Sequence, residues 1–88
     1  MDQSQTQEMD GHPVTGYFKR NVLQKRSYLK FEWCLAAVNN PVYWEIQSDD
    51  DRVRYWTWVP QLNRYLRVVT LEDGITIHNA FPDRRFKQ

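Results

Sequence analysis

The dipeptide Asp73-Gly74 constrains the fold of this chain more than any other feature of its sequence. It lies between two segments, 64–71 and 75–81, that are rich in β-branched and aromatic residues. Asp-Gly between two such segments is a strong hairpin signal, because both residues tolerate the positive φ angles of a two-residue turn. The dipeptide therefore predicts that the two segments pair antiparallel, and it fixes which residues lie opposite each other.

A two-residue turn predicts that Val69 lies opposite His78. In the same register, Arg67 lies opposite Ala80. Because side chains alternate between the two faces of a strand, each face of the pair has its own set of residues. The set predicted to receive a helix is Leu66, Val68, Thr70, Ile77, Asn79 and Phe81. The opposite set is Tyr65, Arg67, Val69, Thr76, His78 and Ala80.

Three further segments complete a predicted α+β fold. Segments 42–47 and 52–59 are predicted to be strands separated by a polar turn. Segment 28–38 has apolar residues at helical spacing, and Ser27 can cap its start. Pro41 ends this helix, because proline disfavours the α conformation in the residue before it. We therefore predict one mostly buried helix packed on a four-stranded antiparallel β-meander.

The length of 88 residues allows one domain. Residues 1–16 are polar and rich in glutamine, so they bury too little apolar surface to offset the entropy lost on ordering. We predict that they form a disordered N-terminal arm. Residues 17–88 are predicted to form the single α+β domain, which ends in a short basic C-terminal tail.

The composition argues against several classes of protein. No apolar run approaches the ~20 residues of a membrane span, and the N-terminus lacks the layout of a signal peptide, which predicts a cytoplasmic protein without membrane contact. Cys34 is the single cysteine, which excludes an intrachain disulfide and a multi-cysteine zinc site, and its apolar surroundings predict a buried structural thiol. The two histidines lack metal-site spacing and no glycine-rich phosphate loop is present, so we expect neither a metal nor a cofactor.

The charged residues are distributed unevenly. Residues 1–51 carry five basic and eight acidic side chains, and residues 52–88 carry seven basic and three acidic ones, which gives −3 and +4. Residues 17–30 hold five basic side chains and no acidic one. Such clusters can bind a polyanion, but they are also common as solvated surface.

The face opposite the predicted helix combines aromatic, basic and imidazole side chains. If segment 60–63 is a simple four-residue hairpin loop, alternation brings part of the preceding strand to this face. The side chains then brought together are Arg54, Trp56, Trp58, Tyr65, Arg67 and His78. Such a face can stack RNA bases on its aromatic rings, hold phosphates with its arginines and transfer a proton through its histidine. The alternative is a second small core under the N-terminal segment, with the arginines paired at its rim.

A family resemblance supports the first interpretation. The segment from Asn39 to Phe86 contains a helix end at Asn-Pro, the strings RVRYW and YLRVV, an acidic-Gly turn and the string DRRF. In this pattern residues 23–86 resemble small bacterial proteins that are distantly similar to RelE/ParE-type and BrnT-type toxins. The resemblance implies a RelE-like helix-and-antiparallel-sheet fold and a metal-independent ribonuclease activity, and it implies a small antitoxin-like protein as a partner besides RNA.

Roles can be assigned to individual residues on this hypothesis. His78 would be the acid or base, and Arg67 and Arg54 would stabilise the charged phosphate. The residues predicted to contact RNA outside this catalytic set are Trp56, Trp58, Tyr65, Arg84 and Arg85. The register places Arg67 close to His78, so we also expect the guanidinium to lower the pKa of His78.

A protein partner is the competing interpretation of the same face. Trp, Tyr and Arg are the residues most enriched at the energetic centres of protein interfaces. A non-catalytic interaction module would therefore use the same composition. Salt dependence separates the two interpretations, because RNA binding releases counterions and an aromatic protein interface does not.

Overall fold

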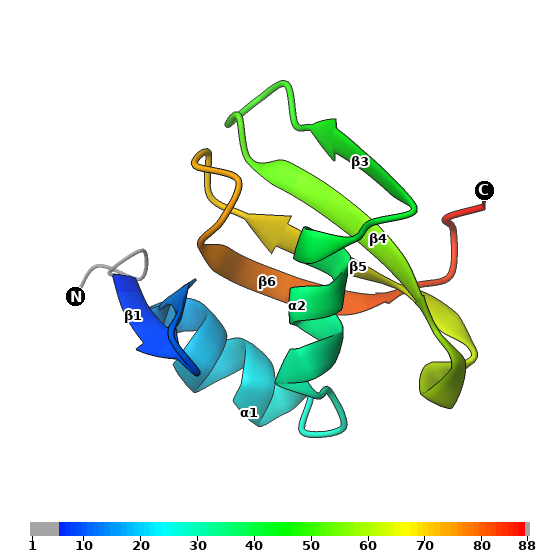
Figure 1. Cartoon of the computed structure of the whole chain (residues 1–88), viewed down its shortest axis with the longest axis horizontal. Coiled ribbons are helices and arrows are strands. Elements are labelled where there is room, and N and C mark those ends of the chain that lie inside the picture. Colours follow the sequence, from blue (N-terminus) through cyan, green and yellow to red (C-terminus); the bar gives the residue numbers. More distant parts are fainter. Residues whose placement is uncertain (1–5, 88) are drawn as a thin grey trace.

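The computed structural model describes residues 6–87, and its central element is one six-stranded mixed sheet (Figure 1). The strands are β1 (Thr6–Met9), β2 (His12–Thr15), β3 (Tyr43–Ile46), β4 (Val53–Val59), β5 (Arg64–Thr70) and β6 (Ile77–Asp83). Their order in the sheet is β1-β2-β6-β5-β4-β3, and β2 pairs with β6 in parallel. The helices are the π-helical turn η1 (Phe18–Val22), α1 (Leu23–Lys25), α2 (Phe31–Asn39) and the 3₁₀ turn η2 (Pro60–Leu62). None of the helices between residues 6 and 87 has both the length and the apolar character that crossing a bilayer requires.

The α+β class is confirmed, but the predicted four-stranded sheet is wrong because β1 and β2 extend it. Both strands lie in the segment predicted to be a disordered arm, of which residues 1–5 lie outside the described residues. The signal for this hairpin is a second Asp-Gly dipeptide. Asp10 and Gly11 both have positive φ, 51° and 79°, and Met9 pairs with His12 across them. These are the φ angles that a two-residue type I′ turn requires.

The N-terminal segment also completes the main core. Residues 16–25 are helical without interruption, and Val14, Phe18 and Val22 are at most 1% exposed. Their side chains pack with Ile77 and Ala80 of β6 in one cluster. A segment that buries this much apolar surface gains enough free energy to order itself, which the polar composition of residues 1–16 alone does not suggest.

Helix α2 covers one face of the sheet. It begins at Phe31 rather than at residue 28, and it ends at Asn39, as the Asn-Pro signal predicts. Its buried residues Cys34 and Ala37 belong to the same core cluster as Leu66 and Val68 of β5. Cys34 is buried, as predicted for a structural thiol, and burial raises the pKa of this thiol to about 12.

The predicted register between β5 and β6 holds only next to the turn. Thr70 pairs with Ile77 as predicted, but a bulge then leaves His78 as the extra residue, so Val69 pairs with Asn79. Every later position is shifted by one residue, and a shift of one residue exchanges the two faces. The predicted pairs Val69–His78 and Arg67–Ala80 are therefore wrong.

The shift moves three residues, Asn79, Ala80 and Phe81, to the face opposite the predicted one. Ala80 is fully buried in the main core, and Phe81 pairs with Arg67 on the other face. The predicted register between β4 and β5 is confirmed, since Trp58 pairs with Tyr65. The loop between these strands closes at Asn63, whose φ of 52° is in the left-handed region.

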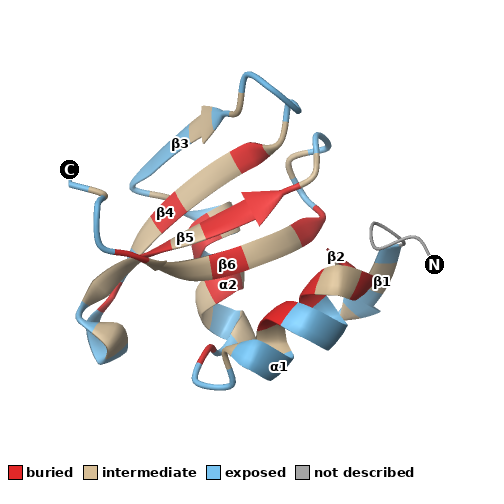
Figure 2. Cartoon of the chain, turned by 180° about the vertical axis from the view of Figure 1, so that it is seen from behind, coloured by how far each residue is buried: buried red, intermediate tan, exposed pale blue. Residues whose placement is uncertain are grey.

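One face of strands β3–β6 points away from α2, and we call it the open face. Figure 2 views the molecule from behind, so that this face is turned to the viewer: no helix lies in front of these strands, and α1 lies along the side of β6. By alternation from the observed pairs, the open face carries Tyr43, Glu45, Arg54, Trp56, Trp58, Tyr65, Arg67, Val69, Asn79, Phe81 and Asp83. Any ligand of the sheet surface therefore meets mainly aromatic and charged side chains here.

Candidate functional site

Five aromatic rings gather at one end of the open face. Trp56 and Phe86 stack with ring centroids 4.7 Å apart, and Tyr65 meets the Phe86 ring edge-on at 5.0 Å. Trp58 in turn meets Tyr65 edge-on at 5.0 Å. The aromatic cluster consists of Tyr43, Trp56, Trp58, Tyr65 and Phe86. Alternation along the strands supplies four of these rings, and the chain after β6 turns back to supply Phe86.

Asp83 connects this cluster to the sheet. Its Oδ2 accepts hydrogen bonds from Trp56 Nε1 at 2.9 Å and from Arg67 Nε and Nη2 at 3.1 and 2.9 Å. Its Oδ1 accepts one from the backbone N–H of Arg85 at 3.0 Å. Burial raises the pKa of Asp83, but these hydrogen bonds and the Arg67 charge outweigh burial and hold the pKa below its usual range. Asp83 is therefore a charged residue inside the cluster, and both of its carboxylate oxygens accept hydrogen bonds.

The two predicted phosphate-binding arginines are engaged with carboxylates. Arg67 is paired with Asp83, and its guanidinium lies 4.9 Å from the ring centroid of Phe81. Arg54 donates from Nη1 to Glu45 at 2.9 Å and from Nε to Gln47 at 2.7 Å. A carboxylate beside each guanidinium competes with a phosphate for the same donors.

His78 lies apart from the aromatic cluster. Its Nδ1 shares a hydrogen bond of 2.9 Å with Thr15 Oγ1, and its ring lies 5.0 Å from that of Tyr17. Burial lowers the pKa of His78, Arg52 lowers it further and Asp50 opposes them. The predicted lowering of the His78 pKa is confirmed. The predicted cause, the charge of Arg67, is not among the groups that lower it. The structure joins His78 to the N-terminal segment.

This burial predicts a pH dependence of stability. The unfolded chain protonates His78 near pH 6.5, whereas the folded chain does so only at lower pH. The free energy of unfolding should therefore fall as the pH drops from about 7.5 to about 5.5, because the unfolded state binds the additional proton. Chemical denaturation of the wild type and of His78→Gln at several pH values measures this, and the variant should show the smaller fall. Equal falls in both proteins would contradict the burial of His78.

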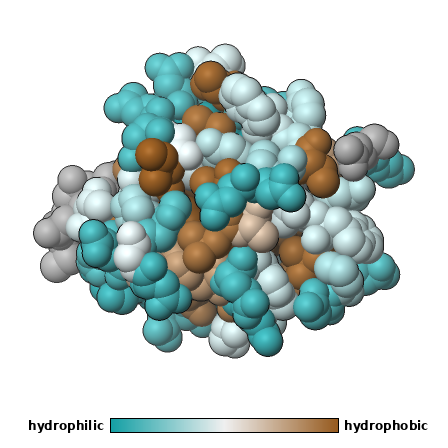
Figure 3. Space-filling model, viewed as in Figure 1, coloured by the Kyte–Doolittle hydropathy of each residue, from teal (hydrophilic) through white to brown (hydrophobic). Residues whose placement is uncertain are grey.

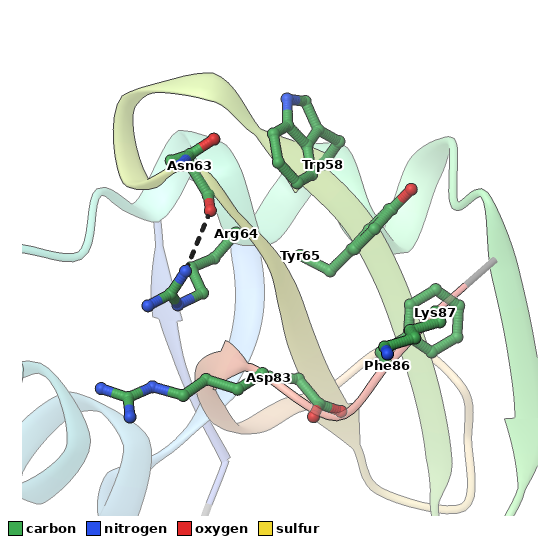
Figure 4. A pocket seen from close by; sticks show the side chains of 8 residues that line it. Trp58, Asn63, Arg64, Tyr65, Asp83, Phe86 and Lys87 are labelled. Atoms are coloured by element: carbon green, nitrogen blue, oxygen red, sulfur yellow. Dashed lines mark hydrogen bonds between the residues drawn. The ribbon is translucent and has the colours of Figure 1, made fainter.

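A groove runs beside the aromatic cluster at the C-terminal end of the chain. We call it the tail groove; its volume is about 310 Å³, and it is lined by Trp58, Asn63, Arg64, Tyr65, Asp83, Arg84, Phe86 and Lys87. In Figure 4 the rings of Trp58, Tyr65 and Phe86 follow one another along one side, and Arg64 lies on the other. Trp58 is 44% exposed, whereas Trp56 underneath the tail is buried. The groove thus combines an accessible indole with basic side chains.

The site that forms differs in part from the predicted one. Trp56, Trp58 and Tyr65 lie together as predicted, and Trp58, Tyr65 and Arg84 line the tail groove. Asp83 and Phe86 were not predicted, because Pro82 suggested that the last strand ends before them. Proline is tolerated at this point because β2 pairs with β6 only at Ile77, so Pro82 needs no donor on that side. Continuing the alternation past Pro82 would have placed Asp83 opposite Tyr65.

Comparisons with known proteins add no relative: no family model, no curated protein and no solved structure matches this chain. The resemblance to the toxin families therefore stays a prediction. Among residues 6–87, no group of three His, Cys, Asp or Glu side chains is placed to hold a metal ion. The aromatic and charged side chains of the open face and the tail groove therefore determine what the site can bind.

Proposed function

We propose that this protein binds single-stranded RNA along the tail groove, without cleaving it. The observation that carries the proposal is the 44% exposed ring of Trp58, which lies in the same groove as Arg64, Arg84 and Lys87. Proteins that bind single strands combine aromatic rings, on which bases stack, with cationic side chains that follow the phosphates. Both features are present within one groove here.

The surrounding charges favour a polyanionic ligand. The groove holds three basic side chains, and its acidic residue, Asp83, is buried and paired with Arg67. A base stacked on Trp58 would place its phosphates near Arg64 and Arg84 at the sides of the groove. Arg85 follows directly in the exposed tail and extends the basic surface.

The charged groups of the predicted catalytic set favour binding over cleavage. Cleavage needs a base, a cation and an acid placed around one phosphate. His78 is bonded to Thr15, and Arg54 and Arg67 are paired with Glu45 and Asp83. The geometry thus supports a binding surface better than a catalytic one.

Truncating Trp58 tests the proposal. Stacking contributes about 1–3 kcal/mol per base, so Trp58→Ala should weaken binding by roughly 5- to 150-fold. The probe is a labelled single-stranded RNA of about 16 nucleotides, the upper site size of small single-strand-binding domains, followed by fluorescence anisotropy. Tyr28→Ala, which removes a similarly exposed aromatic ring from the turn before α2, is the matched control and should bind like the wild type.

Salt separates RNA binding from the competing proposal of a protein partner, including a small antitoxin-like protein. RNA affinity should fall with a log–log slope of about −0.7 for each phosphate contact. The double variant Arg84→Ala/Lys87→Ala should reduce this slope. Undetectable RNA binding at low salt would overturn the proposal, and binding that Trp58→Ala leaves unchanged would exclude the tail groove as its site.

A further inference from the structure

Phe86 occupies a ring-sized site on the open face. Its ring stacks on Trp56 with a centroid distance of 4.7 Å and an interplanar angle of 15°. The rings of Tyr65 and Tyr43 lie beside it, with centroids 5.0 and 6.0 Å from that of Phe86. These three partners come from β5, β4 and β3, which are neighbours in the sheet. The sheet therefore presents an indole for stacking with an aromatic ring on each side, and we call this arrangement the Trp56 platform.

The Trp56 platform has supports other than Phe86. Trp56 Nε1 donates to Asp83 Oδ2 at 2.9 Å, and the Arg67 guanidinium lies 5.4 Å from the centroid of the indole. Asp83 also fixes the tail, since its Oδ1 accepts from the Arg85 N–H at 3.0 Å. The ring of Phe86 follows directly after this anchor and keeps Trp56 only 4% exposed. Departure of the ring would therefore uncover an indole that is already oriented.

Two hollows of the surface meet at Phe86. The tail groove lies on the β5 side of the ring. A second hollow, of about 430 Å³, is lined by Val42, Tyr43, Phe86 and Lys87. Phe86 and Lys87 line both hollows, and Figure 4 shows them at the end of the row of rings that begins at Trp58. The tail thus crosses one aromatic trough that continues from β5 to β3.

The charges beside the trough favour an anionic ligand with a flat ring. Arg64 and Arg84 line the tail groove, and Lys87 lines both hollows. The carboxylate of Asp83 is paired with Arg67, so it repels an anion less than a free carboxylate would. On the α2 side, Figure 3 shows surface hydrophobic residues with hydrophilic ones between them, the usual pattern of a protein surface. The stacking platform with a basic border belongs to the open face.

We propose that the Trp56 platform is a second base-binding subsite, and that an RNA base displaces Phe86 from it. This inference rests on the proposed function and gives the site a size, with one base on Trp58 and the next on Trp56. The two indoles are two residues apart on β4, or about 6.6 Å along the strand, a distance that one extended nucleotide step can span. The displaced tail carries Arg85 and Lys87, whose charges can follow the phosphates.

The exchange of one ring for another predicts that the chain competes with its own ligand. In the wild type a base replaces an existing stack, so the subsite adds little net affinity. In Phe86→Ala the base gains its full stacking contribution, and this variant should bind the RNA of about 16 nucleotides more tightly than the wild type, by roughly 5- to 150-fold. Phe31→Ala, which removes another half-buried phenylalanine, from α2, is the matched control and should bind like the wild type.

A single nucleotide locates the subsite. Adenosine 5′-monophosphate (AMP) has one base and one phosphate, and ring currents from its base shift the NMR signal of an indole Nε1–H on which it stacks. In the wild type, AMP should shift the Trp58 signal and leave that of Trp56 in place. In Phe86→Ala it should shift both signals. RNA bound to the wild type should in turn release the Phe86 ring signals from the upfield shift that stacking on Trp56 imposes.

The outcomes separate this subsite from the tail groove. In Phe86→Ala, an AMP shift at Trp58 alone, or RNA binding no tighter than that of the wild type, would overturn the subsite and leave the tail groove as the RNA site. A shift at Trp56 alone would support the subsite and contradict the tail groove. A Trp56 signal that responds to N-acetyl-phenylalanine amide but not to AMP would overturn a base as the occupant and indicate an aromatic side chain of a partner protein. If Phe86→Ala does not fold, the wild type decides, because Phe86 signals that stay upfield-shifted when RNA is bound would overturn the displacement.

Discussion

Replacing Phe18 with alanine is expected to lower the free energy of unfolding by about 3–5 kcal/mol, which is the range for truncating a fully buried phenylalanine. The Phe18 side chain is completely buried, and its ring lies 6.2 Å from that of Phe31 at the start of α2. The backbone N–H of Phe18 also donates to Thr15 Oγ1, which fixes the start of the helical segment on β2. Phe18 therefore joins the N-terminal segment to the main core.

The expected loss is a large part of the total stability of a small domain, which is typically about 5–15 kcal/mol. Urea denaturation followed by tryptophan fluorescence measures it. Tyr28→Ala is the control from the same part of the chain, and its half-exposed ring should contribute no more than about 0.5 kcal/mol. Similar stabilities of the two variants would mean that the N-terminal segment does not complete the core, as the prediction of a disordered arm implied.

The two Asp-Gly dipeptides show what local sequence can and cannot specify. Asp10-Gly11 forms the two-residue turn, whereas Asp73-Gly74 closes a longer turn in which Asp73 Oδ1 accepts from the N–H groups of Ile75 and Thr76. The pairing of Thr70 with Ile77 next to Asp73-Gly74 nevertheless follows the prediction. The predicted two-residue turn and the observed longer turn place these two residues opposite each other alike. The hairpin at Asp10-Gly11 was not predicted, because the residues around this dipeptide are mostly polar. The hairpin is ordered by the helical segment that follows it, and that contact is not visible in the composition of residues 1–16.

The candidate site was predictable where it follows from alternation within β4 and β5. Trp58 and Tyr65 pair as expected because their loop adds no extra residue to either strand. The position of His78 was not predictable, because the bulge coincides with the parallel pairing of β2 at Ile77 and with the hydrogen bond between His78 and Thr15. These contacts join positions more than sixty residues apart in the chain. No local pattern encodes them.

Replacing Asp83 with alanine is expected to lower the free energy of unfolding by about 2–4 kcal/mol. Removing one partner of a buried ion pair costs about 3–5 kcal/mol, because the other charge stays buried without compensation. The loss of stability in Asp83→Ala should be smaller than this, since the Arg67 side chain is 24% exposed and water can solvate it in part. The variant also leaves Trp56 Nε1 without its acceptor. Asp49→Ala, which removes an exposed carboxylate from the turn after β3, should change stability by less than about 0.5 kcal/mol.

The pH dependence of this difference identifies the charge of Asp83 as its source. Because the folded chain lowers the pKa of Asp83, the stabilisation is fully present above the unfolded value of about 3.9 and is lost as the pH falls through the lower folded value. The wild type and Asp83→Ala should therefore converge in stability below about pH 4. Asp83→Asn, which keeps the shape and one acceptor oxygen but not the charge, should lie between them at pH 7. A difference between wild type and Asp83→Ala that stays constant down to low pH would assign the effect to packing of the tail rather than to the ion pair. In that case Phe86→Ala should reproduce it, because Phe86 is the tail residue that stacks on Trp56.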